Sequence, residues 1–208
     1  MNIYVDFDNT VYDTKRLTDS MILGVAKAVS ENKNLSIDEV LEKINREYDP
    51  SKDNIYLYCE AISEFYGMDK EVLYRKVDFE LDNGRERVYP DTWNFFNILK
   101  DKGHNIVLLT FIPNQNQVYQ MKKLIGSGLA KYYNILIMTA SPKYEIDIDY
   151  HNGIFFDDEP ITVQKLYDNN PYKVYRVRRK NAKYSHIDIE KKEIEEIENF
   201  NEVDLDII

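Results

Sequence analysis

The sequence predicts an α/β protein: a Rossmann-like, three-layer α/β/α parallel sheet with a helical segment inserted after the first strand. Two observations carry this prediction. Short apolar runs rich in β-branched and aromatic residues, which are typical of buried parallel strands, alternate with segments of helical periodicity. Residues 15–86, which follow the first of these runs, carry helical patterns and no strand pattern. Strands that alternate with helices in this way form a parallel sheet.

The elements follow from the pattern in chain order. Strands are predicted over residues 3–5, 105–110, 134–138, 153–156 and 172–177. Helices are predicted over residues 17–29, 37–44, 53–66, 69 to about 83, 92–102, 116–125 and 161–167. Residues 188–200 are predicted as a charged helix or a frayed segment. Ser36 and Glu39 have the spacing of a capping box, and Gly67 stands where a helix is expected to end.

This pattern predicts two domains. Residues 1–14 and 87–208 are expected to form the α/β core, and residues 15–86 a helical domain inserted into it. A helical crossover or a separate four-helix domain would give the same helical pattern over residues 15–86, and both alternatives stay open.

Composition limits the classes of function. The chain has 208 residues and a net charge of −10, which argues against binding to nucleic acid or to acidic membranes through charge alone. A single cysteine, Cys59, excludes an internal disulfide and fits a reducing cytoplasm. No apolar run approaches the roughly 18 residues that a membrane span requires. A small anionic substrate, held by a cation and a few local positive groups, remains compatible with this composition.

Two carboxylates stand where the first predicted strand ends. Asp6 and Asp8 are two residues apart, a spacing that places side chains on the same side of a strand. Close carboxylates repel each other unless a cation lies between them or one of them is protonated. The pair therefore indicates a divalent cation site, a phosphate-handling nucleophile or both, and the alternative is an acidic surface loop.

Other strands of the predicted sheet also end in polar residues. Thr110 ends the second predicted strand, where a hydroxyl group is well placed for a phosphate oxygen, although a simple turn is an alternative. Asp157 and Asp158 follow the strand at residues 153–156, where an acidic turn would be the alternative. Ligands of parallel sheets bind beyond the carboxyl ends of the strands, so these residues are expected near one another.

The string Asp6-Phe7-Asp8-Asn9-Thr10, after an apolar strand, resembles the first motif of the haloacid dehalogenase (HAD) superfamily, DxDx(T/V). The residue after the second Asp is Asn9 instead of the usual Gly. Asn is one of the few residues that tolerate a left-handed backbone, so this is a mild departure. The resemblance implies that Asp6 is a nucleophile and Asp8 a general acid/base.

The remaining motifs of the superfamily have counterparts in the expected order. Thr110 resembles the second motif, and Lys143 is the best match to the third, ahead of Lys131 and Lys165. The pair Asp157 and Asp158 resembles the acidic fourth motif. The helices of residues 15–86 resemble a HAD cap that closes over the core.

The resemblance implies a reaction and a cofactor. Mg²⁺ would be held by Asp6, the Asp8 carbonyl group and Asp158, with Asp157 orienting a metal-bound water. Asp6 would attack phosphorus to form an aspartyl-phosphate, while Lys143 offsets negative charge. Asp8 would protonate the leaving oxygen and then activate water. The expected activity is hydrolysis of a small phosphomonoester, without a membrane or nucleic-acid partner.

A narrower resemblance points to the 5′(3′)-deoxyribonucleotidase branch. Lys143 precedes Asp157 by a segment too short for a helix, and the string from Phe156 to Pro160 resembles IDD(R/K)P, with Glu159 in place of the basic residue. The implied substrate is a (deoxy)nucleoside monophosphate. The alternatives are a sugar-phosphate or polynucleotide 3′-phosphatase on the same core, or a non-catalytic phosphate-binding regulatory protein.

Overall fold

The computed structural model describes residues 1–47, 54–112 and 117–208, and it contains a six-stranded sheet in the order β3-β2-β1-β4-β5-β6. Every pair of neighbouring strands is parallel. The strands are β1 (Asn2–Val5), β2 (Asn105–Phe111), β3 (Ile135–Thr139), β4 (Gly153–Asp157), β5 (Lys173–Val177) and β6 (Glu195–Ile197). This is the strand order of a Rossmann sheet, and it confirms the predicted fold class.

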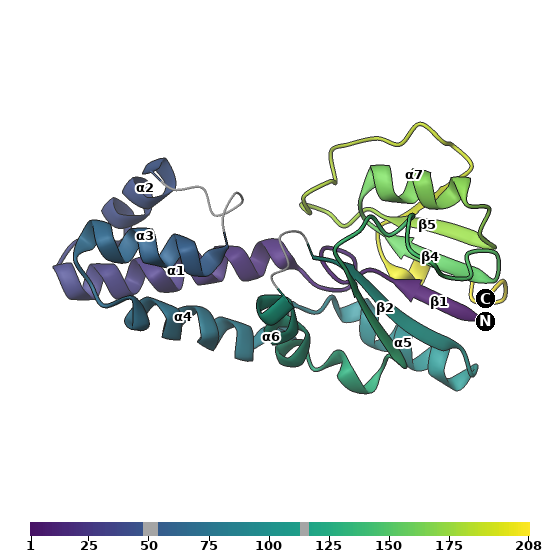
Figure 1. Ribbon diagram of the computed structural model, residues 1–208, viewed down its shortest axis with the longest axis horizontal. Coiled ribbons are helices and arrows are strands. Elements are labelled where there is room, and N and C mark those ends of the chain that lie inside the picture. The colour runs from purple at the N-terminus through teal and green to yellow at the C-terminus, as the bar shows by residue number, and fades with distance from the viewer. Residues whose placement is uncertain (48–53, 113–116) are drawn as a thin grey trace. The chain divides into compact units, whose positions relative to one another are not determined.

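Helices cover both faces of this sheet (Figure 1). The helix α5 (Pro90–Asp101) packs on one face against β2, and α7 (Pro160–Asp168) packs on the other against β4 and β5. Both helices begin with a proline at the first helical position, where its fixed φ favours the helix and no N–H bond is lost. Between β2 and β3 the chain forms α6 (Gln117–Ser127).

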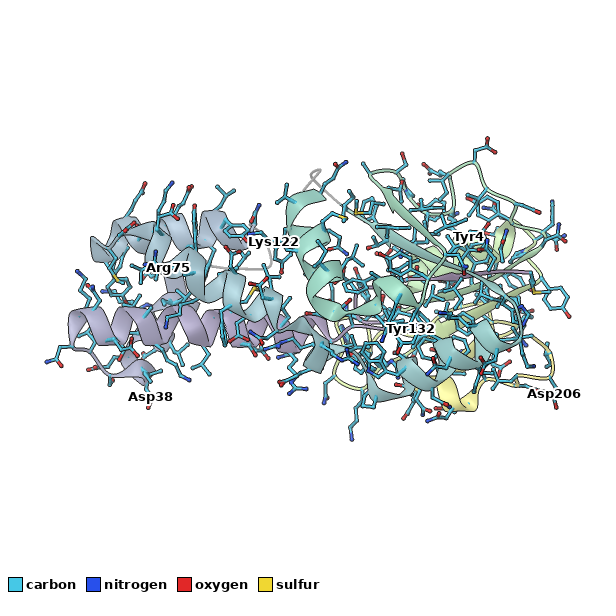
Figure 2. The ribbon with its side chains drawn as sticks, turned by 90° about the horizontal axis from the view of Figure 1, so that it is seen from below. Tyr4, Asp38, Arg75, Lys122, Tyr132 and Asp206 are labelled. Carbon is cyan, nitrogen blue, oxygen red and sulfur yellow. The ribbon has the colours of Figure 1, made fainter. Side chains whose placement is uncertain are left out.

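Side chains alternate between the two faces of the central strands. Tyr4 and Phe155 stack at 4.5 Å between ring centroids and belong to the apolar cluster that α7 covers; Figure 2 shows Tyr4 among the side chains of the sheet. Phe156 and Tyr175 stack at 4.8 Å, and Phe156 packs edge-on against Phe95 of α5. Because neighbouring residues of a strand point to opposite faces, one apolar run supplies side chains to the apolar layer on each face of the sheet.

The chain divides into two compact units, residues 1–15 with 85–208 and residues 16–84. The second unit contains most of α1 (Thr14–Lys33) together with α2 (Ile37–Glu47), α3 (Ile55–Tyr66) and α4 (Lys70–Asp82). The expected capping box is present, since Ser36 and Glu39 exchange hydrogen bonds. Gly67 ends α3 with φ +59°, as predicted. The predicted helix starts at Asp53 and Asn116 lie outside the described residues.

The C-terminal prediction is wrong. Residues 188–200 were expected to be helical or frayed, but Glu195–Ile197 form β6 at the edge of the sheet and a short 3₁₀ helix, η4 (Phe200–Glu202), follows. Glu195 pairs with Lys173 over 2.8 Å and Glu196 with Arg176 over 2.7 Å. A three-residue strand with two glutamates has no apolar alternation, so its pairing with β5 could not be predicted from the sequence pattern.

Gly153 allows two aromatic rings to approach the backbone at the start of β4. A Cβ atom at this position would lie 2.8 Å from both the Phe155 and the Tyr4 rings. We expect Gly153→Ala to lower the free energy of unfolding by roughly 1–3 kcal/mol, because overpacking outweighs the smaller entropic gain of losing a glycine. Urea unfolding measures this, with Gly24→Ala as the control because Cβ there meets its nearest atom at 3.5 Å. Equal stabilities of the two variants would contradict the prediction.

Within the described residues, no helix is long and apolar enough to cross a membrane. The cytoplasmic location expected from the cysteine content stays a prediction.

Candidate active site

The site lies at the carboxyl ends of β1 and β4, which are neighbours in the sheet. In the sheet, β2 lies on one side of β1 and β4 on the other. The strand order therefore reverses direction at β1, and parallel sheets bind ligands at such a switch point. The Asp6 N–H donates to the Phe156 carbonyl group over 2.9 Å, which continues the pairing one residue past β1. Asn9 then adopts φ +59°, the left-handed conformation that the sequence allows for at this position.

A buried lysine joins carboxylates from two strands. Lys143 follows β3, and its Nζ donates to Asp6 Oδ1 over 2.5 Å and to Asp157 Oδ2 over 2.7 Å. The three residues are at most 6% exposed. The second oxygen of Asp6, Oδ2, accepts from Thr10 Oγ1 over 3.2 Å. Residues 140–152 reach β4 without a helix, as the short spacing between Lys143 and Asp157 predicts.

A third carboxylate completes a cluster that can hold a metal ion. Asp6, Asp157 and Asp158 each offer a carboxylate oxygen, and these oxygens all lie within 4.8 Å of one another. Both oxygens of Asp157 are engaged, one by Lys143 and the other by the Glu159 N–H over 2.9 Å. By contrast, Asp158 Oδ2 is buried and has no hydrogen-bond partner within the described residues. A buried oxygen without a partner is costly, and a cation would satisfy it.

The electrostatics of the cluster also favour a bound cation. Burial raises the pKa of the Asp6 carboxyl to about 7; Lys143 opposes this rise, and the charges of Asp157 and Asp8 add to it. Burial likewise raises the pKa of Asp158, assisted by the charges of Asp6 and Asp157. Lys143 keeps its charge, because attraction to Asp157 and Asp6 outweighs its burial and raises its pKa. One ammonium group therefore does not neutralise the cluster.

Asp8 lies in a second set of contacts. Its Oδ1 accepts hydrogen bonds from the Lys123 ammonium and the Thr14 hydroxyl, and its Oδ2 accepts from Gln120 Nε2 over 2.9 Å. Burial would raise the pKa of Asp8, but Lys123, together with the hydrogen bonds from Thr14 and Gln120, outweighs burial and lowers it. In this arrangement Asp8 is a carboxylate.

Thr110 belongs to the same set. Its side chain is 1% exposed at the end of β2, and its Oγ1 accepts from Gln120 Nε2 over 3.0 Å. All six residues expected at the site are therefore present at one edge of the sheet. Asp6, Lys143, Asp157 and Asp158 form one group, and Gln120 connects Asp8 with Thr110 in the other.

Sequence reasoning missed Gln120, Lys123 and Thr14. Gln120, Lys123, Leu124 and Ser127 are the buried residues of α6, a spacing of one helix face. Of these four residues only Leu124 is apolar, so hydrophobic periodicity did not mark this face, and the spacing of the glutamine and the lysine was the available signal.

Comparisons with known proteins identify the fold. Neither a protein-family model nor a curated protein sequence matches the chain. A HAD phosphatase from Thermococcus onnurineus is 19% identical with a TM-score of 0.62, covering 97% of this chain and 94% of that one. A magnesium-bound protein from Bacillus subtilis, described as a HAD-hydrolase, is 14% identical with a TM-score of 0.59, covering 97% and 95%. This chain has the haloacid dehalogenase fold.

The HAD fold does not by itself select a reaction. A 2-haloacid dehalogenase from Pseudomonas syringae is also similar, at 13% identity and a TM-score of 0.56, with 95% of this chain and 94% of that one covered. At such identities the likeness establishes architecture, while chemistry depends on the residues of the site.

Proposed function

We propose that this protein is a Mg²⁺-dependent phosphomonoester hydrolase that reacts through an aspartyl-phosphate at Asp6. The observation that carries the proposal is the group formed by Asp6, Lys143, Asp157 and Asp158. One ammonium group bridges two buried carboxylates, and an oxygen of the third carboxylate has no hydrogen-bond partner among the residues that the structure describes. Such a group fits a nucleophile and a cation site side by side.

Asp6 is the proposed nucleophile. Lys143 and Thr10 hold its two oxygens, so the orientation of the carboxylate is fixed before substrate binds. The Asp6–phosphorus bond forms as the bond to the leaving oxygen breaks. Lys143 offsets the repulsion between the carboxylate and the phosphate, and the Thr110 hydroxyl group is proposed to donate to a phosphate oxygen.

Asp8 is the proposed general acid and base. It gives a proton to the leaving oxygen, and it then takes a proton from the water that attacks the phosphorus of the aspartyl-phosphate. The lowered pKa of Asp8 favours its ionised form, and this is the form that takes up the proton from water. Haloalkanoate dehalogenases of this superfamily lack an acid at this position, so Asp8 favours phosphate ester hydrolysis.

The residues present fit Mg²⁺. Asp6 and Asp158 offer carboxylate oxygens, the ligand type that Mg²⁺ prefers, and the Asp8 carbonyl group is the proposed third protein ligand. Asp157 is occupied by Lys143 and the Glu159 N–H, so we assign it to orienting its neighbours instead of direct ligation. When bound, the cation would offset negative charge on the substrate phosphate and on the cluster.

The proposed substrate is a small phosphomonoester such as a (deoxy)nucleoside monophosphate, and residues 15–86 are the proposed cap. Glu159, which replaces the basic residue of the deoxyribonucleotidase string, accepts hydrogen bonds from Thr162 Oγ1 over 2.5 Å and the Tyr184 hydroxyl over 3.2 Å. It therefore has a local structural role in this chain that a basic residue would not fill.

A phosphate-release screen tests the proposal. The panel should contain p-nitrophenyl phosphate, nucleoside monophosphates, sugar phosphates, amino-acid phosphates and single-stranded DNA with a 3′-phosphate. We expect turnover that depends on Mg²⁺, is lost with a chelator and returns when Mg²⁺ is restored. The absence of Mg²⁺-dependent phosphate release from every member of the panel would contradict the proposed enzyme.

The raised pKa of Asp6 predicts how the stability of the metal-free protein depends on pH. The pKa of Asp6 is about 7 in the folded protein and 3.8 in the reference state, so the protonated form favours folding. The contribution of Asp6 to the free energy of unfolding is therefore complete below pH 3.8, and it is lost as the pH rises through about 7. We expect the metal-free protein to melt at a lower temperature at pH 8 than at pH 5.

Mg²⁺ must displace protons at low pH, so its stabilising effect should grow as pH rises. Differential scanning fluorimetry with and without Mg²⁺ at pH 5 and pH 8 measures this increment, and Asp158→Asn should reduce it at pH 8. Equal increments at the two pH values would contradict the assignment of Asp6 and Asp158 as ligands.

A further inference from the structure

Lys123 is a buried lysine beside Asp8 that the proposed mechanism does not use. Its side chain is 4% exposed, and its ammonium group forms an ion pair with the Asp8 carboxylate. Lysines are rarely buried unless they are paired. The ammonium group also lies 5.6 Å from the centroid of the Phe7 ring and 5.2 Å from that of Tyr119. Aromatic faces therefore help to fix the charge in place.

Gln120 holds the other oxygen of the same carboxylate. It precedes Lys123 by three residues on α6, so both side chains leave one face of the helix. Its amide group donates to Asp8 Oδ2 and to Thr110 Oγ1, the hydroxyl proposed to bind phosphate. The two residues thus set the position and rotation of the Asp8 carboxyl group relative to the end of β2.

A purely structural role would not require these residue types. On the buried face of a helix, an apolar side chain of similar volume is commonly at least as stable as an ion pair, because burying charge carries a desolvation cost. The lysine and glutamine are directed at the one carboxylate that must meet the leaving oxygen. Proton transfer requires hydrogen-bond geometry, and small displacements reduce its rate strongly.

We propose that Lys123, together with Gln120, is a positioning residue that fixes the Asp8 carboxyl group relative to the leaving oxygen of the substrate and acts on the reaction through Asp8. The step it serves is the transfer of a proton from Asp8 to the leaving oxygen while the bond to phosphorus breaks. Lys123 itself does not need to touch the substrate. This inference rests on the proposed function of the site.

The dependence of rate on the leaving group distinguishes this role from general support of the fold. p-Nitrophenolate departs without a proton, whereas a more basic phenolate needs one. kcat/KM reports events up to the phosphorylation of Asp6 and excludes the later attack by water. A residue that positions the acid should therefore affect kcat/KM for poor leaving groups and spare it for good ones.

The experiment measures kcat/KM of wild type and Lys123→Met with substituted phenyl phosphates, from p-nitrophenyl to p-methoxyphenyl. We expect a loss of about tenfold or more for the p-methoxyphenyl ester and less than about threefold for the p-nitrophenyl ester, since general acid catalysis contributes about 10²–10⁴-fold. Lys122→Met is the matched control, because successive residues of a helix point about 100° apart and Lys122 therefore leaves a different side of α6.

A double-mutant cycle tests whether Lys123 acts through Asp8. In an Asp8→Asn background, Lys123→Met should reduce kcat/KM for the p-methoxyphenyl ester by less than about threefold, because the group that it positions is already absent. Gln120→Leu should reproduce the leaving-group dependence, and it serves as the test if thermal melting shows that Lys123→Met is unfolded.

The outcomes separate the two proposals. If wild type hydrolyses p-nitrophenyl phosphate but Lys123→Met loses the same factor with every ester, or adds its full loss to Asp8→Asn, the positioning role is overturned and the hydrolase proposal stands. If wild type has no Mg²⁺-dependent activity with any ester, both are overturned.

Discussion

We expect the Asp6→Asn variant to lose at least about 10³-fold in kcat with any substrate that the wild type hydrolyses, because an amide oxygen cannot replace the attacking carboxylate. The fold should persist, since Asn fills nearly the same volume and Lys143 keeps its hydrogen bond to Asp157. Phosphate release under saturating Mg²⁺ measures the activity, and circular dichroism with thermal melting checks the fold.

The matched control is Asp147→Asn, the same chemical change at an exposed aspartate of the connection between β3 and β4. It should retain wild-type activity. An Asp6→Asn variant that is folded and turns over within tenfold of wild type would show that another group attacks phosphorus.

Lys143→Met is expected to have large effects on both stability and activity. Removing the ammonium group leaves Asp6, Asp157 and Asp158 buried without a cationic side chain between them. Breaking one side of a buried ion pair costs about 3–5 kcal/mol of unfolding free energy. Loss of a charge that opposes repulsion in the transition state should reduce kcat by about 10²-fold or more.

Urea unfolding without metal at pH 8 gives the stability change, and steady-state kinetics with Mg²⁺ gives the change in kcat. The controls are Lys131→Met and Lys165→Met, the two exposed lysines that the sequence offered as alternatives to Lys143. Each should change the free energy of unfolding by no more than about 0.5 kcal/mol. The assignment of Lys143 fails if a control variant shows the larger loss of activity.

The sheet and the acidic group could be predicted because their signals are local. Apolar runs identified five of the strands, and parallel order brought their carboxyl ends to one edge of the sheet. Asp6, Asp157 and Asp158 follow directly from this placement. Lys143 follows a strand end, although the sequence alone could not show that its ammonium group reaches two carboxylates.

The contacts of Asp8 could not be predicted in the same way. Lys123 is 115 residues from Asp8 in the chain. The buried face of α6 carries three polar residues and one leucine, so apolar periodicity identifies neither this face nor the strand end that it meets. The edge strand β6 was missed for another reason. Its two glutamates form ion pairs with Arg176 and Lys173 of β5. Opposite charges on neighbouring strands therefore support this pairing, and they leave no apolar alternation in the sequence of β6.

The central claim is that Asp6 carries the phosphoryl group during turnover. The most direct measurement uses the Asp8→Asn variant with p-nitrophenyl phosphate, because this ester phosphorylates Asp6 without a proton donor while the attack by water lacks its base. The reaction is quenched in acid and reduced with borohydride, and the peptides are analysed by mass spectrometry. We predict conversion of residue 6 to homoserine; modification of a different residue, or rapid turnover with residue 6 never modified, would contradict the account.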